Sequence, residues 1–207
     1  MKSNDLCEKL NIMIENPHCE LEYNKDYELL IAVMLSAQCT DKRVNIVTKS
    51  LFSKYSLRQI ANLSLDVLER EIKSLGSYSK KAYYTKKIAE SLINDYAGKV
   101  PNNREYLESL PGVGRKTCNV VLSELFDEPT IAVDTHVERV SKRIGLVKAN
   151  DDVSKIEHKL MKYFEKKDYN RVNHQLVLFG RYICTAKNPN CEKCLINCQH
   201  KKTKEIL

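Results

Sequence analysis

The sequence predicts an all-α protein, and two observations carry that prediction. Apolar residues recur at steps of three and four along most of the chain, and no segment keeps the alternation of a half-buried strand. Ser, Thr, Asp and Asn precede many of these apolar stretches and glycine follows several, as is common where helices begin and end. With 207 residues and 43% hydrophobic content, the chain can bury one or two cores.

The helices are expected in a definite order. An N-terminal helix comes first, and Tyr27–Ala37 follows as a helix buried in a core, because it is apolar almost all round. The residues expected to begin the later helices are Thr40 or Asp41, Ser64, Ser79, Asn102 or Asn103, Asp134 or Thr135, Asp151 and Asn170. Gly98 and Gly145 are expected to end two of them. Five or six helices between Glu20 and Glu128 would form one domain.

The charge of the chain favours a polyanionic partner. Lys and Arg number 34 against 27 Asp and Glu, a formal net charge of +7, although ordinary soluble proteins can carry as much. We expect most lysines to lie on solvated helix faces, with a subset contacting phosphate. No apolar run is long enough to span a membrane, and the first residues, MKSNDLCEKLNIMIEN, lack the apolar stretch of a secretory signal. We therefore expect a cytoplasmic protein with reduced thiols.

The stretch LPGVGRKT, residues 110–117, has the composition of a phosphate-binding turn. Gly112 and Gly114 permit φ > 0 and leave no Cβ in the way of an approaching group. Apolar residues at steps of three and four then indicate a helix that begins in the turn, with its unpaired N–H groups and positive dipole end outward. A phosphate can bind there. A plain connection between two helices is the alternative, which the neighbouring Arg115 and Lys116 disfavour.

Four cysteines near the end of the chain have the spacing of a metal centre. Cys184, Cys191, Cys194 and Cys198 form a C-x6-C-x2-C-x3-C pattern within 15 residues. In a reducing compartment this pattern favours a metal centre over disulfides. Four thiolates suit either a tetrahedral zinc ion or a [4Fe-4S] cluster, and the spacing alone leans towards zinc. The remaining cysteines have no pairing pattern and are interpreted as small buried hydrophobic residues: Cys7, Cys19, Cys39 and Cys118.

Several stretches spread over the chain resemble one family. They are LPGVGRKT, its continuation NVVL…TIAVDTHVERV, the upstream LLIAVMLSAQCTD and the downstream VLFGRYIC, which leads into the cysteines. Together they are similar to the endonuclease III family of helix-hairpin-helix DNA glycosylases, over nearly the whole chain. The resemblance implies a bifunctional DNA glycosylase and abasic-site lyase of base excision repair that removes oxidised pyrimidines from damaged double-stranded DNA. No small-molecule substrate and no membrane are implied, and a monomer is the default.

The resemblance also implies two helical domains. A six-helix, barrel-like domain that contains the helix-hairpin-helix would span residues 20–128. A discontinuous domain would combine residues 1–19 with 129–207 and would carry an iron-sulfur cluster loop at 184–198. The DNA cleft would lie between these two domains. Composition and periodicity do not show this division by themselves.

Lys116 and Asp134 match the catalytic positions of the family. A lysine amine can attack the sugar C1′ and form a Schiff base, which later permits strand scission by β-elimination. A carboxylate can stabilise the cationic sugar and take the proton of the lysine. Without the family, Lys116 would be interpreted as a solvated or phosphate-binding lysine and Asp134 as a helix N-cap. The capping and catalytic roles of Asp134 can coexist.

Further residues are implied to contact DNA. The target atom lies inside the duplex, so the nucleotide must be flipped out and its space refilled. Gln38 matches the inserted glutamine of the family, and Asp41 matches a residue of the lesion pocket. Ser77 stands where the family usually has a bulky apolar wedge, so either Tyr78 substitutes by stacking or Gln38 does more of the opening. Contacts to the DNA backbone are expected from Gly112, Val113, Gly114, Arg115, Lys187 and Lys193.

For the cysteines, the resemblance implies a [4Fe-4S] cluster in place of zinc. The family holds this cluster with cysteines spaced C-x6-C-x2-C-x5-C, and here the last gap is two residues shorter. The shorter loop must still bring Cys198 to the cluster, so zinc or an incomplete cluster stays open as an alternative. We expect the cluster to hold the structure and dock DNA, without taking part in the chemistry.

Two other functions fit parts of the sequence. Adenine and mismatch-thymine glycosylases of the same superfamily share the cluster and the aspartate but lack a lysine at the hairpin position, so Lys116 argues against them. A non-catalytic helix-hairpin-helix module would bind DNA backbone without chemistry. The presence of both Lys116 and Asp134 disfavours such a module.

Overall fold

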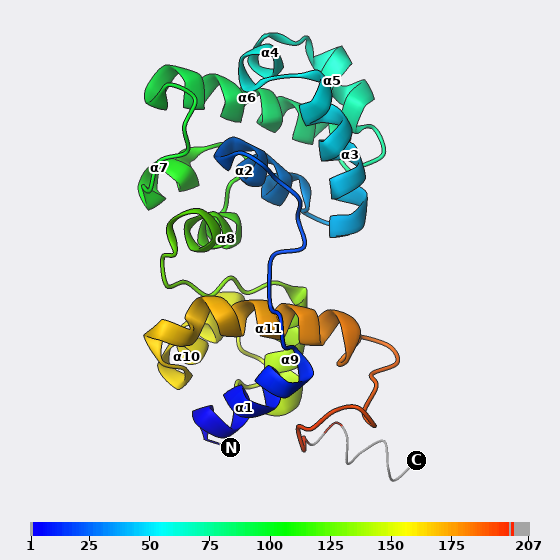
Figure 1. The fold of residues 1–207 in the computed structure, drawn as a ribbon, viewed down its shortest axis with the longest axis vertical. Helices are drawn as coiled ribbons and strands as arrows, with labels where there is room; N and C mark the ends of the chain where they lie inside the picture. Colours follow the sequence, from blue (N-terminus) through cyan, green and yellow to red (C-terminus); the bar gives the residue numbers. More distant parts are fainter. Residues whose placement is uncertain (1, 199, 201–207) are drawn as a thin grey trace. The chain divides into compact units, whose positions relative to one another are not determined.

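The computed structural model describes residues 2–198 and 200. Within these residues it contains eleven α-helices, one 3-10 helix and no strand, which confirms the all-α prediction. The chain divides into two compact units, which can be followed by colour in Figure 1. The hairpin unit is Cys19–Phe126, and the terminal unit combines Met1–His18 with Asp127–Leu207. In the described part of the chain, no helix is long and apolar enough to cross a membrane.

Seven helices are found in the hairpin unit, every residue of which is described. In chain order they are α2 (Asp26–Leu35), α3 (Asp41–Lys54), α4 (Leu57–Asn62), α5 (Leu65–Ile72), α6 (Tyr78–Tyr96), α7 (Arg104–Ser109) and α8 (Arg115–Phe126). Every side chain from Tyr27 to Leu35 of α2 is buried, and α2 packs against α3, α6 and α8. The predicted core helix is therefore confirmed, although it ends before Ala37. The short α4 was not predicted.

The terminal unit is organised around α11. Its described helices are α1 (Ser3–Met13), α9 (Thr135–Ile144), α10 (Val153–Tyr163), the 3-10 helix η1 (Lys166–Asp168) and α11 (Tyr169–Tyr182). α11 packs against α1, α9 and η1, and α9 packs against α10. Leu6 and Leu10 of α1 are fully buried in the same core as Phe179 of α11. Burying each of these side chains contributes roughly 1.5–3 kcal/mol, so α1 is an integral part of this core.

Several predicted helix boundaries are confirmed. The Thr40 hydroxyl accepts a hydrogen bond from the main-chain N–H of Arg43 at 3.3 Å and caps α3. Asp134 caps α9, and Gly145 ends that helix in the left-handed conformation with φ of 82°. Each of these residues supplies what a helix end lacks: an acceptor for a free N–H group, or a residue without a Cβ at positive φ.

Three predicted helix starts are wrong by one or two residues. The predicted and observed N-cap positions are Ser79 and Ser77 for α6, Asp151 and Asp152 for α10, and Asn170 and Asp168 for α11. Where two capping residues are adjacent, the backbone of the turn decides which one faces the first N–H groups of the helix. Asp152 does so in α10, and Asp151 forms an ion pair with Lys159 at 2.6 Å instead. The Asn170 side chain accepts from the N–H of Thr130 rather than capping α11.

Candidate functional site

The turn between α7 and α8 is tightly packed on one side. Leu110 and Val113 are buried, and the N–H of Val113 donates to the carbonyl of Leu110 at 3.1 Å. Gly112 has φ of 82°, and a Cβ built on it would lie 2.4 Å from Cδ2 of Tyr84. Only glycine fits there, because the backbone is left-handed and an aromatic ring touches it. Tyr84, which sequence reasoning missed, therefore supports the turn from α6.

The other side of the same turn is open. A Cβ on Gly114 would meet no atom within 4 Å, and Gly114, Arg115 and Lys116 are exposed. α8 begins at Arg115, so its first N–H groups and its positive dipole end lie at this open side. The turn thus combines a fixed backbone with accessible positive charge, which suits a phosphate.

The positive charge of Lys116 acts on the partly buried thiol of Cys19. Within the described residues its amine has no hydrogen bond and no ion pair. The pKa of the Cys19 thiol is raised to about 12, chiefly by burial and also by the negative charges of Glu124 and Asp41, whereas the positive charge of Lys116 acts to lower it. Asp41, predicted as a pocket residue, and Lys116 therefore lie around the same thiol in the hairpin unit. Cys19 and Glu124 were not predicted as part of this surrounding.

Asp134 lies in the terminal unit, at the start of α9. Its Oδ1 accepts from the main-chain N–H groups of His136 and Val137, both at 2.8 Å. Its Oδ2 has no hydrogen-bond partner among the described residues, and the side chain is half-buried. One carboxylate oxygen therefore fixes the side chain, while the other stays available to a ligand.

Gln38 and Ser77 share an unusual backbone conformation. Gln38, between α2 and α3, has φ of 58°, and Ser77, immediately before α6, has φ of 55°. Both residues are exposed, and neither side chain has a hydrogen bond within the described part of the chain. A left-handed non-glycine residue costs roughly 1–3 kcal/mol and persists only where the surrounding structure holds it. Tyr78, predicted as a substitute wedge, is half-buried and packs against the core of the hairpin unit.

The four C-terminal cysteines line one small hollow of about 20 Å³ in the terminal unit. The residues around it are Ile144, Phe179, Ile183, Cys184, Pro189, Asn190, Cys191, Cys194, Cys198 and His200. Among the described residues, no three His, Cys, Asp or Glu side chains are gathered closely enough to share a single metal ion. All eight cysteines are free thiols, and Cys118 is buried as predicted, whereas Cys7, Cys19 and Cys39 are only partly buried. Lys187 and Lys193 are exposed on the same loop.

Two arginines of α9 hold the first residues of the cysteine loop. Arg139 donates to the carbonyl of Gly180 at 2.8 Å and to that of Cys184 at 3.3 Å. Arg143 donates to the carbonyls of Thr185 and Ala186 at 2.6 and 2.8 Å, and its Nη1 lies 3.5 Å from Sγ of Cys184. The sequence prediction missed both. Their only signal was that they lie four residues apart on one helix face.

Another residue that the sequence prediction missed is Lys81, because it treated most lysines as solvated. Lys81 is 5% exposed, and its amine donates to the carbonyl of Ala37 at 2.8 Å. The burial of Lys81 fits the helical periodicity of α6. Four buried residues follow one another at steps of four, three and four: Lys81, Thr85, Ile88 and Leu92.

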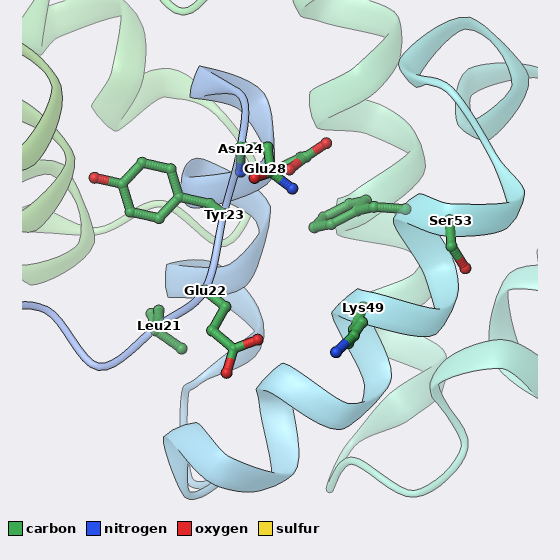
Figure 2. A pocket seen from close by; sticks show the side chains of 8 residues that line it. Leu21, Glu22, Tyr23, Asn24, Glu28, Lys49 and Ser53 are labelled. Carbon is green, nitrogen blue, oxygen red and sulfur yellow. Dashed lines mark hydrogen bonds between the residues drawn. The ribbon is translucent and has the colours of Figure 1, made fainter.

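A separate pocket of the hairpin unit contains none of the predicted site residues (Figure 2). It has a volume of about 620 Å³ and is lined by Leu21, Glu22, Tyr23, Asn24, Glu28, Lys49, Phe52 and Ser53. The Glu28 carboxylate accepts from the main-chain N–H groups of Asn24 and Lys25, at 2.8 and 3.3 Å. Glu28 therefore stabilises the start of α2. This structural role explains the presence of its carboxylate in the wall of the pocket.

Comparison with known proteins connects this geometry to DNA repair. Residues 31–166 match the HhH-GPD superfamily of base excision DNA repair proteins. The chain is 46% identical to Endonuclease III of Bacillus subtilis over 196 residues, which cover 94% of this chain and 90% of that protein. Endonuclease III of Escherichia coli is 41% identical, with 92% of each chain covered.

Solved structures agree with these relatives. A non-covalent Endonuclease III–DNA complex superposes with a TM-score of 0.93 at 44% identity, covering 100% of both chains. A trapped covalent Endonuclease III–DNA intermediate gives a TM-score of 0.92, also at 44% identity and with 99% of each chain covered. A thermostable thymine-DNA glycosylase, at 24% identity, shares the fold with a TM-score of 0.83 over 97% of each chain.

Proposed function

Because the chain belongs to the endonuclease III family of HhH-GPD base excision repair proteins, we propose that Lys116 is its nucleophile and Asp134 the carboxylate that assists it. The chain is a DNA N-glycosylase with abasic-site lyase activity that acts on oxidised pyrimidines. The observation that supports these roles best is the state of Lys116. Its amine is exposed at the first turn of α8 and unpaired within the described residues, beside a turn suited to phosphate.

The reaction needs few groups. The neutral amine of Lys116 attacks C1′, the bond between C1′ and the damaged base breaks, and the base leaves with a proton. Loss of the ring oxygen from C1′ gives a Schiff base, after which removal of a C2′ proton breaks the C3′–O bond and cuts the strand. Asp134 takes the proton of the lysine and stabilises positive charge on the sugar. Its Oδ2 suits this role, because Oδ1 alone caps α9.

The DNA contacts are assigned from the surface of each unit. Gly112, Val113, Gly114 and Arg115 form the backbone-binding turn of the hairpin unit, with phosphate at the start of α8. Gln38 enters the duplex and refills the space of the flipped nucleotide, Asp41 contacts the flipped base, and Ser77 lies next to the opening. Tyr78 gives limited help as a wedge, since half of its side chain is committed to the core.

The C-terminal cysteines suit a [4Fe-4S] cluster. Cys184, Cys191, Cys194 and Cys198 line one hollow without converging on a point. Four thiolates can bind either this cluster or a zinc ion, and membership of the endonuclease III family favours the cluster. When bound, the cluster supplies a rigid cross-link between the ends of the loop. Lys187 and Lys193 then present positive charge to phosphates of damaged double-stranded DNA.

We further propose that the protein acts as a monomer in the cytoplasm, where thiols stay reduced. Affinity should fall steeply with salt, because contacts with phosphate provide much of it.

Borohydride trapping tests this assignment. The protein is incubated with a duplex that contains an oxidised pyrimidine, and borohydride is added to reduce any Schiff base. Wild-type protein should give a covalent adduct, and Lys116→Ala should give none while still binding DNA. An adduct that persists in Lys116→Ala would assign the nucleophile to another residue. Excision without any adduct would indicate a monofunctional glycosylase, and binding without excision a non-catalytic module.

A further inference from the structure

We propose that Lys81 is a positioning residue, which ties together the two exposed turns that carry Gln38 and Ser77. Its side chain reaches one turn and its main chain the other. The Nζ atom donates to the carbonyl of Ala37 at 2.8 Å, and the main-chain N–H donates to the carbonyl of Ser77 at 3.1 Å. This inference rests on the proposed entry of Gln38 into the duplex.

The surroundings of Lys81 are unusual for a lysine. The residue is 5% exposed, and no carboxylate pairs with it among the described residues. Lysine is rarely buried without such a partner, because removing its charge from water is costly. The partners present are the carbonyl of Ala37 and the sulfur of Cys39, at 2.8 and 3.3 Å. These two residues are the immediate neighbours of Gln38 in the chain.

The position of the amine at the end of α2 explains why this burial is tolerated. α2 ends at Leu35, and the negative end of its dipole points at the turn that follows. An ammonium group there interacts favourably with the dipole and donates to the carbonyl of Ala37, two residues beyond the end of the helix. The ammonium group of Lys81 therefore stabilises the backbone of residues 37–39, and a neutral side chain of the same length would not stabilise it in the same way.

The held backbone matters because Gln38 is strained. A side chain that must enter a duplex loses less conformational freedom on binding if its backbone is already fixed. The Gln38 backbone is held at φ of 58°, with Lys81 bonded on one side and the Cys39 N–H donating to the Ser36 carbonyl at 3.0 Å. Lys81 thus keeps Gln38 pre-organised at a fixed distance from Ser77.

The test compares two rates at saturating enzyme. One is excision of an oxidised pyrimidine paired in a duplex, which requires opening. The other is strand scission at an abasic site inside an unpaired bubble, which does not. Lys81→Met keeps the stem of the side chain but loses its donors. We expect the ratio of the first rate to the second to fall about tenfold, because small displacements of a positioning group have effects of this order.

Lys86→Met is the matched control. Lys86 lies on the same helix, and its amine donates to two main-chain carbonyls, those of Ala61 and Leu63, both at 2.7 Å. Those carbonyls belong to the end of α4 and to the residue that follows it, and not to the Gln38 turn. The variant should lose thermal stability comparable to that of Lys81→Met and keep the wild-type ratio. If Lys81→Met does not fold, Lys81→Gln, whose side chain is too short to reach Ala37, replaces it with the same expected fall.

A double variant tests whether Lys81 acts by positioning Gln38 or lowers the rate ratio by a separate effect. Gln38→Ala should lower the ratio by itself, and Gln38→Ala with Lys81→Met should be no lower than Gln38→Ala, because Lys81 acts through Gln38. If the effects of the two substitutions on the ratio multiply in the double variant, the proposal is overturned. It is also overturned if Lys81→Met keeps the wild-type ratio while Gln38→Ala lowers it. A wild-type ratio in Gln38→Ala would overturn the insertion role on which the proposal rests. A wild-type protein that forms no borohydride adduct would instead refute the proposed catalytic function.

Discussion

The hairpin turn at residues 110–116 and the cysteine loop at residues 184–198 are held in opposite ways. The hairpin turn is closed by the chain itself: Leu110 and Val113 are buried, and the backbone of Gly112 lies against the ring of Tyr84. In the cysteine loop, Ile196 is the one fully buried side chain among the described residues. Contacts within the chain therefore fix the first, whereas we expect the second to depend on what its thiols bind.

The arginines of α9 make this contrast sharper. Arg139 and Arg143 donate to main-chain carbonyls of residues 180–186 but to none in residues 187–198. The loop is thus fixed where it leaves α11. Its later part contains three of the four thiols and is attached by the Asn190 N–H, which donates to the Ile183 carbonyl at 2.8 Å, and by the buried Ile196. A region that binds phosphate through its own backbone must be rigid in advance, while a cofactor loop can acquire its rigidity from the cofactor.

The largest effect should come from removing one thiolate. Cys184→Ser should yield protein without the brown colour of iron, with amide hydrogen exchange in residues 187–198 as fast as in an unfolded chain. Four-thiolate metal sites contribute on the order of 10 kcal/mol to local folding, so the part of the loop that the arginines do not hold should open. Exchange in residues 110–118 should not change.

Cys7→Ser is the control for this experiment, since Cys7 is a partly buried thiol on α1 outside the loop. It should keep the iron and the slow exchange. A protected loop in Cys184→Ser, or wild-type protein that binds zinc and no iron after anaerobic expression, would contradict the cluster assignment. Loss of protection in the hairpin would remove the contrast between the two regions.

The hairpin should fail for a purely steric reason. In Gly112→Ala the new Cβ would lie 2.4 Å from Tyr84 at a φ of 82°, so both ring and backbone must move. Strain and overpacking together should lower the free energy of unfolding of the hairpin unit by about 2–4 kcal/mol. Urea unfolding followed by circular dichroism measures this.

Gly114→Ala is the matched substitution two residues away, because a Cβ there meets nothing within 4 Å and its φ is not left-handed. It should change stability by less than about 0.5 kcal/mol. Equal losses in the two variants would show that the turn is not fixed by the contact between Gly112 and Tyr84.

Local signals in the sequence were sufficient for much of the helix framework. Thr40, Asp134 and Gly145 act within one helical turn of themselves, so their roles follow from residue type and position. The buried character of α2 followed from its unbroken apolar run. The errors arose where a tertiary choice decides, as at Asp151 and Asp152, which are chemically identical neighbours.

The details of the candidate site depend on contacts between segments far apart in the sequence. No residue near Lys81 in the sequence indicates that its amine reaches Ala37, 44 residues earlier, because that contact requires α6 to pack against α2. The left-handed backbone of Gln38 is likewise imposed by its surroundings, since glutamine does not favour it. The catalytic roles of Lys116 and Asp134 were predicted from a family resemblance. Residue chemistry alone favoured a solvated or phosphate-binding lysine and a helix N-cap.

The smallest expected effect tests whether another turn of the terminal unit, unlike the cysteine loop, is held by side chains of the protein itself without a bound cofactor. The turn before α10, in the same unit, is closed by charge: Asp151 accepts from the Lys159 amine at 2.6 Å and from the Lys148 N–H at 2.7 Å, and these bonds lower the pKa of its carboxyl. A carboxyl whose pKa is lowered by folding stabilises the fold above its ordinary pKa of 3.8, and the stabilisation is lost as the pH falls through the lowered value. Asp151→Asn should therefore be less stable than wild type at pH 7, and the two urea midpoints should converge as the pH falls below the lowered pKa of Asp151. Hydrogen bonds from Lys155 lower the pKa of the Asp152 carboxyl as well, but its side chain is more exposed and solvent screens the charge, so Asp152→Asn, which keeps a good N-cap, should lose less stability at pH 7 than Asp151→Asn. A gap between Asp151→Asn and wild type that persists in acid would mean that packing, and not charge, closes this turn.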